Sequence, residues 1–300
     1  MPVTLLKDAV SDRLACVGFR REKLSDIPDP GDILKERILT GDKLEIDIFS
    51  EDKFMVTISE QQYSRIVSAS YWYSLHKIKE QRKLICSHSV KDIPIAWLLI
   101  TAYYSSFYSA IELSRLFGLY NLNLSGEQCR AVVSQTTFKE TLQSGTYLGG
   151  VDFESSGEVK ITFSRQEKVK PHELAWKNMT SVLKFNNRNK LLDKKVKKFD
   201  LLNEIFNMQK RKLKMPNNIR NEWNYSIPNS YDPLFCQEVE SIYEYIGLEG
   251  SRDILNWANT NKKMNGKQNS VFSIFYIEII LFQTLLDMKS KILDDCNISN

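Results

Sequence analysis

A run of 19 residues without a charged side chain, from Ile93 to Ile111, constrains the fold of this chain most strongly. Its length is close to that of a helix that spans a membrane. The run also holds polar groups that are costly against lipid, namely Tyr103, Tyr104, Ser105, Ser106, Tyr108 and Ser109. We therefore expect a central helix that is buried on all sides in a helical bundle, and no membrane span.

A second long helix is predicted directly before this one. Ser59 and Gln62 match the capping box that starts a helix, and apolar residues then recur at three-to-four spacing to about Ser87. Pro94 suits the first turn of the next helix, and Gly118 ends it. Because a short loop joins the two helices, we expect them to pack as an antiparallel pair.

Short segments that alternate apolar and polar residues, the period of a half-buried strand, predict two β-hairpins. Residues 44–49 and 54–58 predict one β-hairpin, and residues 151–163 predict a second small one. Residues 119–145 are ambiguous between short helices and loop. Further helical patterns cover residues 171–185, 191–209, 234–246, 250–259 and 271–293. The predicted fold class is mainly α, a helical bundle with one or two small appended β-hairpins.

The length of 300 residues allows one or two domains. We expect residues 1–58 to form an N-terminal extension that carries the first hairpin. Residues 59–300 then form the helical domain, with an insertion near residues 140–170 that carries the second hairpin.

The positive charge of the chain is concentrated in one segment. The whole chain has 41 basic and 37 acidic residues, a net charge of +4. Residues 184–214 alone contain eleven basic and three acidic residues, a net charge of +8. Such a segment is typical either of a surface that binds the phosphate backbone of RNA or of solvated helix faces. The candidate RNA-binding residues are Lys194, Lys195, Lys197, Lys198, Arg211 and Lys212.

Several chemistries lack their sequence motifs. The five cysteines form no CxxC pair and their number is odd, which favours reduced, mostly buried thiols in a cytoplasmic protein. The N-terminus has no basic segment followed by an apolar core, so we expect no signal peptide. Motifs for a P-loop, a dinucleotide fold, a zinc site and a serine-hydrolase elbow are missing. We therefore expect neither a cofactor nor a metal.

One constellation carries a recognisable pattern. Arg220 and Asn221 lie near a predicted helix start, and the aromatic residue Tyr225 follows five positions after the arginine. Upstream, residues 102–110 combine aromatic and small side chains. Together these features resemble the Arg-x4-6-His motif and the aromatic central helix of the HEPN-domain family (higher eukaryotes and prokaryotes nucleotide-binding). The resemblance covers residues 59–118 and 171–259.

The resemblance implies a helical bundle that acts as a metal-independent endoribonuclease in a bacterial toxin–antitoxin or phage-defence system. It also implies a homodimer that places two copies of Arg220 across one cleft. In this interpretation Arg220 holds the scissile phosphate, and Asn221 orients the loop or donates to the phosphate. Tyr225 stands where active members of the family carry a histidine. The expected catalytic residues are thus Arg220, Asn221 and Tyr225.

Tyr225 is the departure from the family pattern. Metal-free RNA cleavage needs a base for the ribose 2′-hydroxyl, and arginine, which is always cationic, cannot be that base. Histidine accepts a proton near neutrality, whereas tyrosine, with an ordinary pKa of about 10, is mostly protonated at pH 7. Either Tyr225 is tuned, or a histidine enters from elsewhere, or the site binds RNA without cleaving it.

Two functions therefore stay open. The preferred one is RNA binding, with metal-independent cleavage as its more specific form. The alternative is a non-catalytic helical subunit that binds a partner protein of such a system, for example an antitoxin. Arg220 and Asn221 also have ordinary interpretations, as a surface arginine in a salt bridge and as a helix cap. Among the histidines, we expect His76 in the core, His88 near a helix end and His172 at a helix start.

Overall fold

The computed structural model describes residues 2–23, 33–86, 93–138, 141–152, 157–188, 216–221, 224 and 271–294. The chain divides into two compact units, each built from separate stretches of sequence. The first, here called the helical unit, comprises Met1–Leu6, Leu75–Ala110 and Met179–Leu286. The second, here called the sheet unit, comprises Lys7–Ser74, Ile111–Asn178 and Asp287–Asn300.

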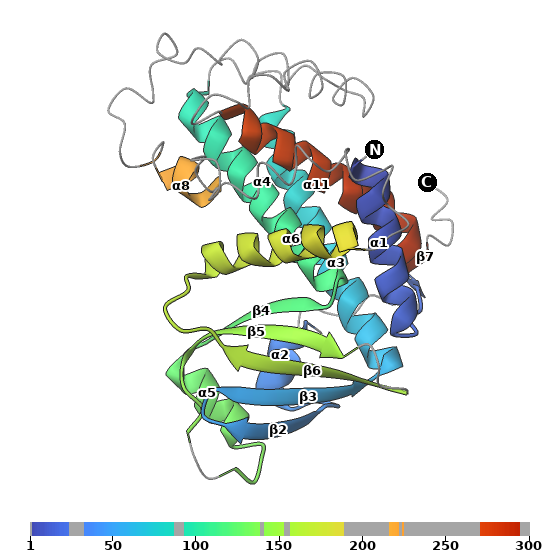
Figure 1. The fold of residues 1–300 in the computed structure, drawn as a ribbon, viewed down its shortest axis with the longest axis vertical. Helices are drawn as coiled ribbons and strands as arrows, with labels where there is room; N and C mark the ends of the chain where they lie inside the picture. The colour runs from blue at the N-terminus through green and yellow to red at the C-terminus, as the bar shows by residue number, and fades with distance from the viewer. Residues whose placement is uncertain are drawn as a thin grey trace. The chain divides into compact units, whose positions relative to one another are not determined.

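The sheet unit contains a five-stranded antiparallel sheet with the strand order β2-β3-β6-β5-β4 (Figure 1). The strands are β2 (Glu45–Ser50), β3 (Lys53–Ser59), β4 (Leu119–Leu124), β5 (Gly145–Asp152) and β6 (Glu158–Arg165). The two predicted hairpins are confirmed as β2–β3 and β5–β6. Strand β4 lies in a segment for which the sequence predicted only short helices or loop.

The expected fold class, mainly α with small appended hairpins, is wrong. The two hairpins are not separate appendages, because β3 pairs with β6 along its whole length, from Lys53 opposite Ser164 to Ser59 opposite Glu158. The result is a mixed α and β fold with one continuous sheet. The β3–β6 pairing joins residues about a hundred positions apart. A local alternation of apolar and polar residues cannot report such a pairing.

The sheet buries one set of alternating side chains. Phe54 and Phe163 face each other across β3 and β6 with ring centroids 4.9 Å apart, and both are fully buried. Gly149 on β5 lies opposite Phe163, and a Cβ atom at this position would lie 2.5 Å from the Phe163 ring. The phenylalanine stack therefore requires a glycine at position 149.

The two predicted long helices are α3 (Glu60–Ile85) and α4 (Ile95–Leu116). The capping box before α3 is confirmed, since the Gln62 amide N–H donates to Ser59 Oγ and the Ser59 amide N–H donates to Gln62 Oε1. Gly118, with φ of +80°, follows the end of α4. Contacts of Ser70 with Glu112 and of Lys77 with Tyr108 run in opposite directions along the helices, which confirms the antiparallel pairing.

The other helices include two that confirm sequence patterns nearly to the residue, α6 (Pro171–Arg188) and α11 (Val271–Ile292). The remaining described elements are α1 (Pro2–Cys16), α2 (Leu34–Thr40), α5 (Gly126–Val133), α8 (Pro216–Asn221), and the short parallel strands β1 (Glu22–Lys23) and β7 (Leu293–Asp294). The helices predicted at 191–209, 234–246 and 250–259 lie outside the described residues.

The core of the helical unit is organised around a buried carboxylate on α11. Glu278 is fully buried; it accepts a hydrogen bond from the Ser105 hydroxyl at 2.8 Å and pairs with the Arg82 guanidinium. Side chains of three helices, α3, α4 and α11, thus meet at the Glu278 carboxylate. A buried charge is tolerated only when it is paired in this way.

Helix α4 is not buried on all sides, which corrects the expectation for residues 93–111. In the helical unit its alanines, leucines and serines are buried, but Trp97 is 57% exposed and Tyr104 and Tyr108 are half-buried. Among the described helices, none is long and apolar enough to cross a membrane. The central helix therefore has one face that carries aromatic side chains toward solvent.

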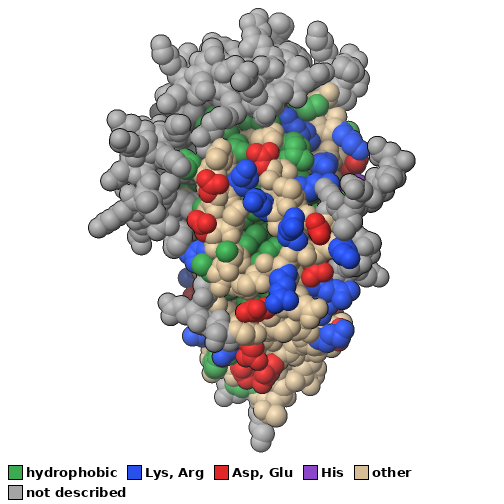
Figure 2. All heavy atoms as spheres, turned by 90° about the vertical axis from the view of Figure 1, so that its right-hand side faces the viewer, with side chains coloured by type: hydrophobic (Ala, Val, Ile, Leu, Met, Phe, Trp, Pro, Cys, Tyr) green, Lys and Arg blue, Asp and Glu red, His purple; other side chains and the backbone are tan. Residues whose placement is uncertain are grey.

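Charged side chains of both signs are mixed on the surface shown in Figure 2, where described lysines and arginines alternate with aspartates and glutamates.

The three described cysteines are free thiols: Cys129 is buried, Cys86 is half-buried and Cys16 is exposed. Burial raises the pKa of the Cys129 thiol. The expectation of mostly buried thiols thus holds for Cys129 and not for Cys16.

Candidate functional site

The sequence-predicted site residues fall partly within the described residues. Arg220 and Asn221 end helix α8, which begins at the predicted helix-start residue Pro216. Asn221 is exposed and Arg220 is half-buried. Tyr225 lies outside the described residues, as do the six candidate RNA-binding residues Lys194, Lys195, Lys197, Lys198, Arg211 and Lys212.

The structure brings the Arg220 motif and the aromatic central helix together. Arg220 Nη2 donates a hydrogen bond of 2.6 Å to the hydroxyl of Tyr104 on α4. The guanidinium carbon also lies 5.5 Å from the ring centroid of Tyr104 and 5.9 Å from that of Tyr103. The two sequence features of the resemblance, 116 positions apart in this contact, therefore form one site in the helical unit.

Asn221 holds the other end of the guanidinium. Its Oδ1 accepts a hydrogen bond of 2.8 Å from Arg220 Nη1. Asn221 is the last residue of α8. The contacts with Asn221 and Tyr104 are with neutral groups, and they orient the guanidinium. An oriented guanidinium can bind a phosphate through two parallel hydrogen bonds.

Aromatic rings continue along α4 from this point. The rings of Tyr104 and Tyr108 are near parallel, at 26°, with centroids 6.1 Å apart. Lys77 of α3 places its Nζ atom 3.6 Å from the centroid of the Tyr108 ring. The sequence did not single out Lys77, because its position over Tyr108 follows only from the pairing of α3 with α4. Two cations therefore accompany this row of rings, Arg220 at Tyr104 and Lys77 at Tyr108.

The contacts of Arg220 with Tyr103, Tyr104 and Asn221 involve no histidine. His76 is exposed on α3, so the expectation that it lies in the core is wrong. The helix period places it on the solvent side, two residues before the buried Ile78. His172 is half-buried in the first turn of α6, as predicted, and His88 lies outside the described residues.

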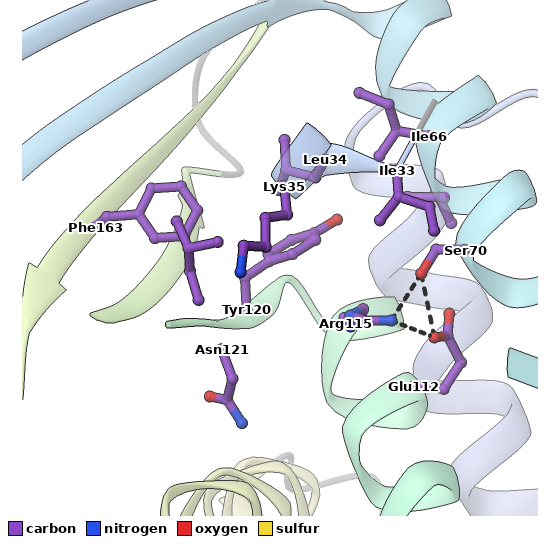
Figure 3. Close-up of a pocket in the computed structure, with 12 residues that line it drawn as sticks. Ile33, Leu34, Lys35, Ile66, Ser70, Glu112, Arg115, Tyr120, Asn121 and Phe163 are labelled. Carbon is purple, nitrogen blue, oxygen red and sulfur yellow. Dashed lines mark hydrogen bonds and ion pairs between the residues drawn. The ribbon is translucent and has the colours of Figure 1, made fainter. Parts of the chain in front are cut away.

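A second polar cluster lies in the sheet unit and borders a small pocket (Figure 3). Glu112 is 1% exposed, and its Oε2 atom accepts hydrogen bonds from Ser74 at 2.7 Å, Arg115 at 2.9 Å and Ser70 at 3.3 Å. The cavity has a volume of about 40 Å³, room for a few water molecules. Its lining consists of Ile33, Leu34, Lys35, Ile66, Val67, Ser70, Glu112, Arg115, Tyr120, Asn121, Leu122 and Phe163.

The polar side chains of this cluster form hydrogen bonds with one another. Arg115 Nη1 bonds both Glu112 and the Ser70 hydroxyl, the latter at 2.8 Å. Beside the cluster, burial raises the pKa of Tyr63 to about 12 and raises the pKa of Tyr120 as well, so both phenols are neutral at physiological pH. A small pocket with an internally satisfied ion pair fits a structural role in joining α3 to α4.

Within the described residues, no group of three or more histidine, cysteine, aspartate or glutamate side chains could hold a metal ion. Comparison with protein-family models, with curated proteins and with solved structures finds no match for this chain. The geometry around Arg220 is therefore the main structural indication of function.

Proposed function

We propose that this protein binds RNA, with Arg220 as a phosphate contact held against helix α4. The observation that carries the proposal is the pair of hydrogen bonds from Arg220 to Tyr104 and Asn221. These bonds fix an always-charged, planar group at a half-buried position beside aromatic rings. Arginine next to aromatic side chains is a combination that suits RNA, because phosphates and bases alternate along the strand.

The basic segment supports the same function from the sequence. This segment precedes α8 in the sequence, and its net charge of +8 over residues 184–214 would add contacts with the RNA backbone. The proposed contacts in this segment are Lys194, Lys195, Lys197, Lys198, Arg211 and Lys212. Each would contribute to affinity without regard to base sequence, because phosphate contacts carry no sequence information.

The resemblance to the HEPN family adds a more specific proposal. In it the protein is a metal-independent endoribonuclease of a bacterial toxin or phage-defence system and acts as a homodimer. Arg220 would stabilise the charge on the scissile phosphate, Asn221 would keep the guanidinium in place, and Tyr225 would occupy the position of the family's histidine. RNA binding does not depend on this second step.

The binding proposal is tested with Arg220→Ala and with Arg130→Ala as a matched control. Arg130 is an exposed arginine on α5 of the sheet unit, so both variants lose one positive charge. We expect Arg220→Ala to lose about 10- to 150-fold in affinity for a short RNA, since a charge-assisted contact contributes about 1.5–3 kcal/mol. Arg130→Ala should bind like the wild type. Equal loss in both variants would reduce the role of Arg220 to net charge.

The cleavage proposal is tested separately by incubating the protein with total RNA and tRNA in EDTA. Cleavage by the wild type and by Arg130→Ala, but not by Arg220→Ala, is the expected result. Binding without cleavage would retain the first proposal and remove the second. If RNA is not retained even at low salt, the non-catalytic subunit that binds a partner protein becomes the better account.

A further inference from the structure

We infer that the exposed face of α4 is a stacking surface that selects single-stranded RNA. The inference rests on the proposed RNA binding and specifies its substrate class. Trp97, Tyr104 and Tyr108 are spaced seven and four residues apart on α4. At 3.6 residues per turn, all three side chains leave the helix within roughly 20° of one direction. They form one line about 16 Å long, at 1.5 Å per residue.

The line is accessible along its length. Trp97 is 57% exposed, one of three large hydrophobic side chains with this degree of exposure among the described residues. Tyr104 and Tyr108 are half-buried, whereas their neighbours Tyr103 and Phe107 are buried. The helix therefore divides its aromatic residues into a buried set and a set that is wholly or partly exposed, and we assign ligand contact to the second set.

Cations accompany the exposed set. Lys77 Nζ lies 3.6 Å from the centroid of the Tyr108 ring, and the Arg220 guanidinium carbon lies 5.5 Å from that of Tyr104. Lys77 is an exposed, flexible side chain. When a base approaches Tyr108, Lys77 can leave the ring face for a phosphate, and the base can take its place. The exchange is favourable because base stacking on an aromatic residue is stronger than an exposed cation–π contact.

This arrangement fits a single strand better than a duplex. The bases of a duplex are stacked on each other and present no faces to a helix surface, whereas unpaired bases can stack on aromatic side chains. It also fits RNA better than a second copy of this chain, because the face combines two cations with the aromatic rings. A copy of the same face would bring like charges together.

The experiment compares three probes of equal length with the full-length protein: a single-stranded RNA, the same RNA as a duplex, and a strand with abasic sites. The variant is Trp97→Ala. The matched control is Phe49→Ala, which removes a 56% exposed aromatic residue on β2 of the sheet unit that also has a lysine, Lys53, over its ring at 5.8 Å. Circular dichroism of both variants verifies folding.

We expect wild-type protein to bind the single strand at least tenfold more tightly than the duplex or the abasic strand. Trp97→Ala should lose about tenfold on the single strand and little on the other two probes. Phe49→Ala should match the wild type on all three. Sedimentation of the wild type and Trp97→Ala should give the same oligomeric state.

Two results would overturn the inference and leave the proposed function intact: equal binding of all three probes, or loss of affinity in Trp97→Ala that is equal on all of them. A change of oligomeric state in Trp97→Ala would also overturn it, by assigning the face to a second copy. Failure of the wild type to bind any probe would instead contradict RNA binding itself.

Discussion

The Arg220 guanidinium donates a hydrogen bond to the Tyr104 hydroxyl at 2.6 Å and thereby joins the end of α8 to the middle of the central helix. This phenolic oxygen, together with Asn221 Oδ1, orients the cation on which the proposed function depends. Tyr104 and Arg220 are both half-buried.

Tyr104→Phe tests this positioning role. The variant keeps the ring over which Arg220 lies and removes only the hydrogen-bond acceptor. We expect affinity for single-stranded RNA to fall about threefold to tenfold, in line with about 0.5–1.5 kcal/mol for one hydrogen bond. The matched variant Tyr108→Phe removes a hydroxyl from the same face, four residues further on, and should change affinity less. If the two variants bind alike, the Tyr104 hydroxyl does not position Arg220.

The buried ion pair of the helical unit predicts a large effect on stability. In the contact of Arg82 with Glu278, the side chains are 12% and 0% exposed. Arg82→Ala removes the guanidinium that faces this buried carboxylate, which should cost about 3–5 kcal/mol in the free energy of unfolding. Lys83→Ala is the control, since Lys83 and its partner Glu80 are 72% and 51% exposed and such pairs contribute about 1 kcal/mol or less. Urea denaturation measures both; similar small losses would argue against the buried contact.

Two adjacent glycines of strand β5, Gly149 and Gly150, should respond differently to replacement by alanine. At Gly149 a new Cβ atom would lie 2.5 Å from the Phe163 ring, whereas at Gly150 it would meet nothing within 4 Å. Phe163 cannot yield easily, because it is fully buried and stacked on Phe54. We expect Gly149→Ala to lose about 1–3 kcal/mol in stability through overpacking. Gly150→Ala should be near neutral, and a reversed order would contradict the β5–β6 register.

Stability should fall in alkaline solution. Burial raises the pKa of Tyr63 and that of Tyr276 to about 12 in the folded protein, while an unfolded tyrosine has a pKa of about 10. Above pH 10 the unfolded chain loses these protons first, so each tyrosine lowers the free energy of unfolding by about 1.4 kcal/mol per pH unit until about pH 12. Between pH 10 and 11, Tyr63→Phe should remove the contribution of one tyrosine from the slope of the free energy of unfolding against pH. An unchanged slope would show that Tyr63 titrates normally.

The local elements could be predicted from the sequence because their signals are local. The Ser59–Gln62 capping box, the start of α8 at Pro216 and the two hairpins each follow from residues a few positions apart. The β3–β6 pairing could not be predicted this way. It joins two hairpins that lie about a hundred positions apart, and neither hairpin carries a local signal for its partner. The fold class was wrong for this reason.

The site was predictable in part for the same reason. Arg220 and the aromatic helix were recognised as separate patterns, but their contact through Tyr104 follows only from tertiary structure. The exposed face of α4 was missed because 19 uncharged residues indicate burial, and neither charge nor hydropathy marks Trp97 as exposed. Lys77 had no signal of its own, since its partner Tyr108 lies on another helix.

The salt dependence of RNA binding tests the central claim most directly. The association constant for a single-stranded RNA is measured for wild type, Arg220→Ala and Arg130→Ala at several salt concentrations. Its logarithm is then plotted against the logarithm of the salt concentration. If Arg220 contacts a phosphate, its replacement should weaken binding at every salt concentration and reduce the slope by about 0.7–1, the share of one phosphate contact. Arg130→Ala should keep the wild-type slope. Identical slopes and affinities for wild type and Arg220→Ala would contradict the proposed role of Arg220.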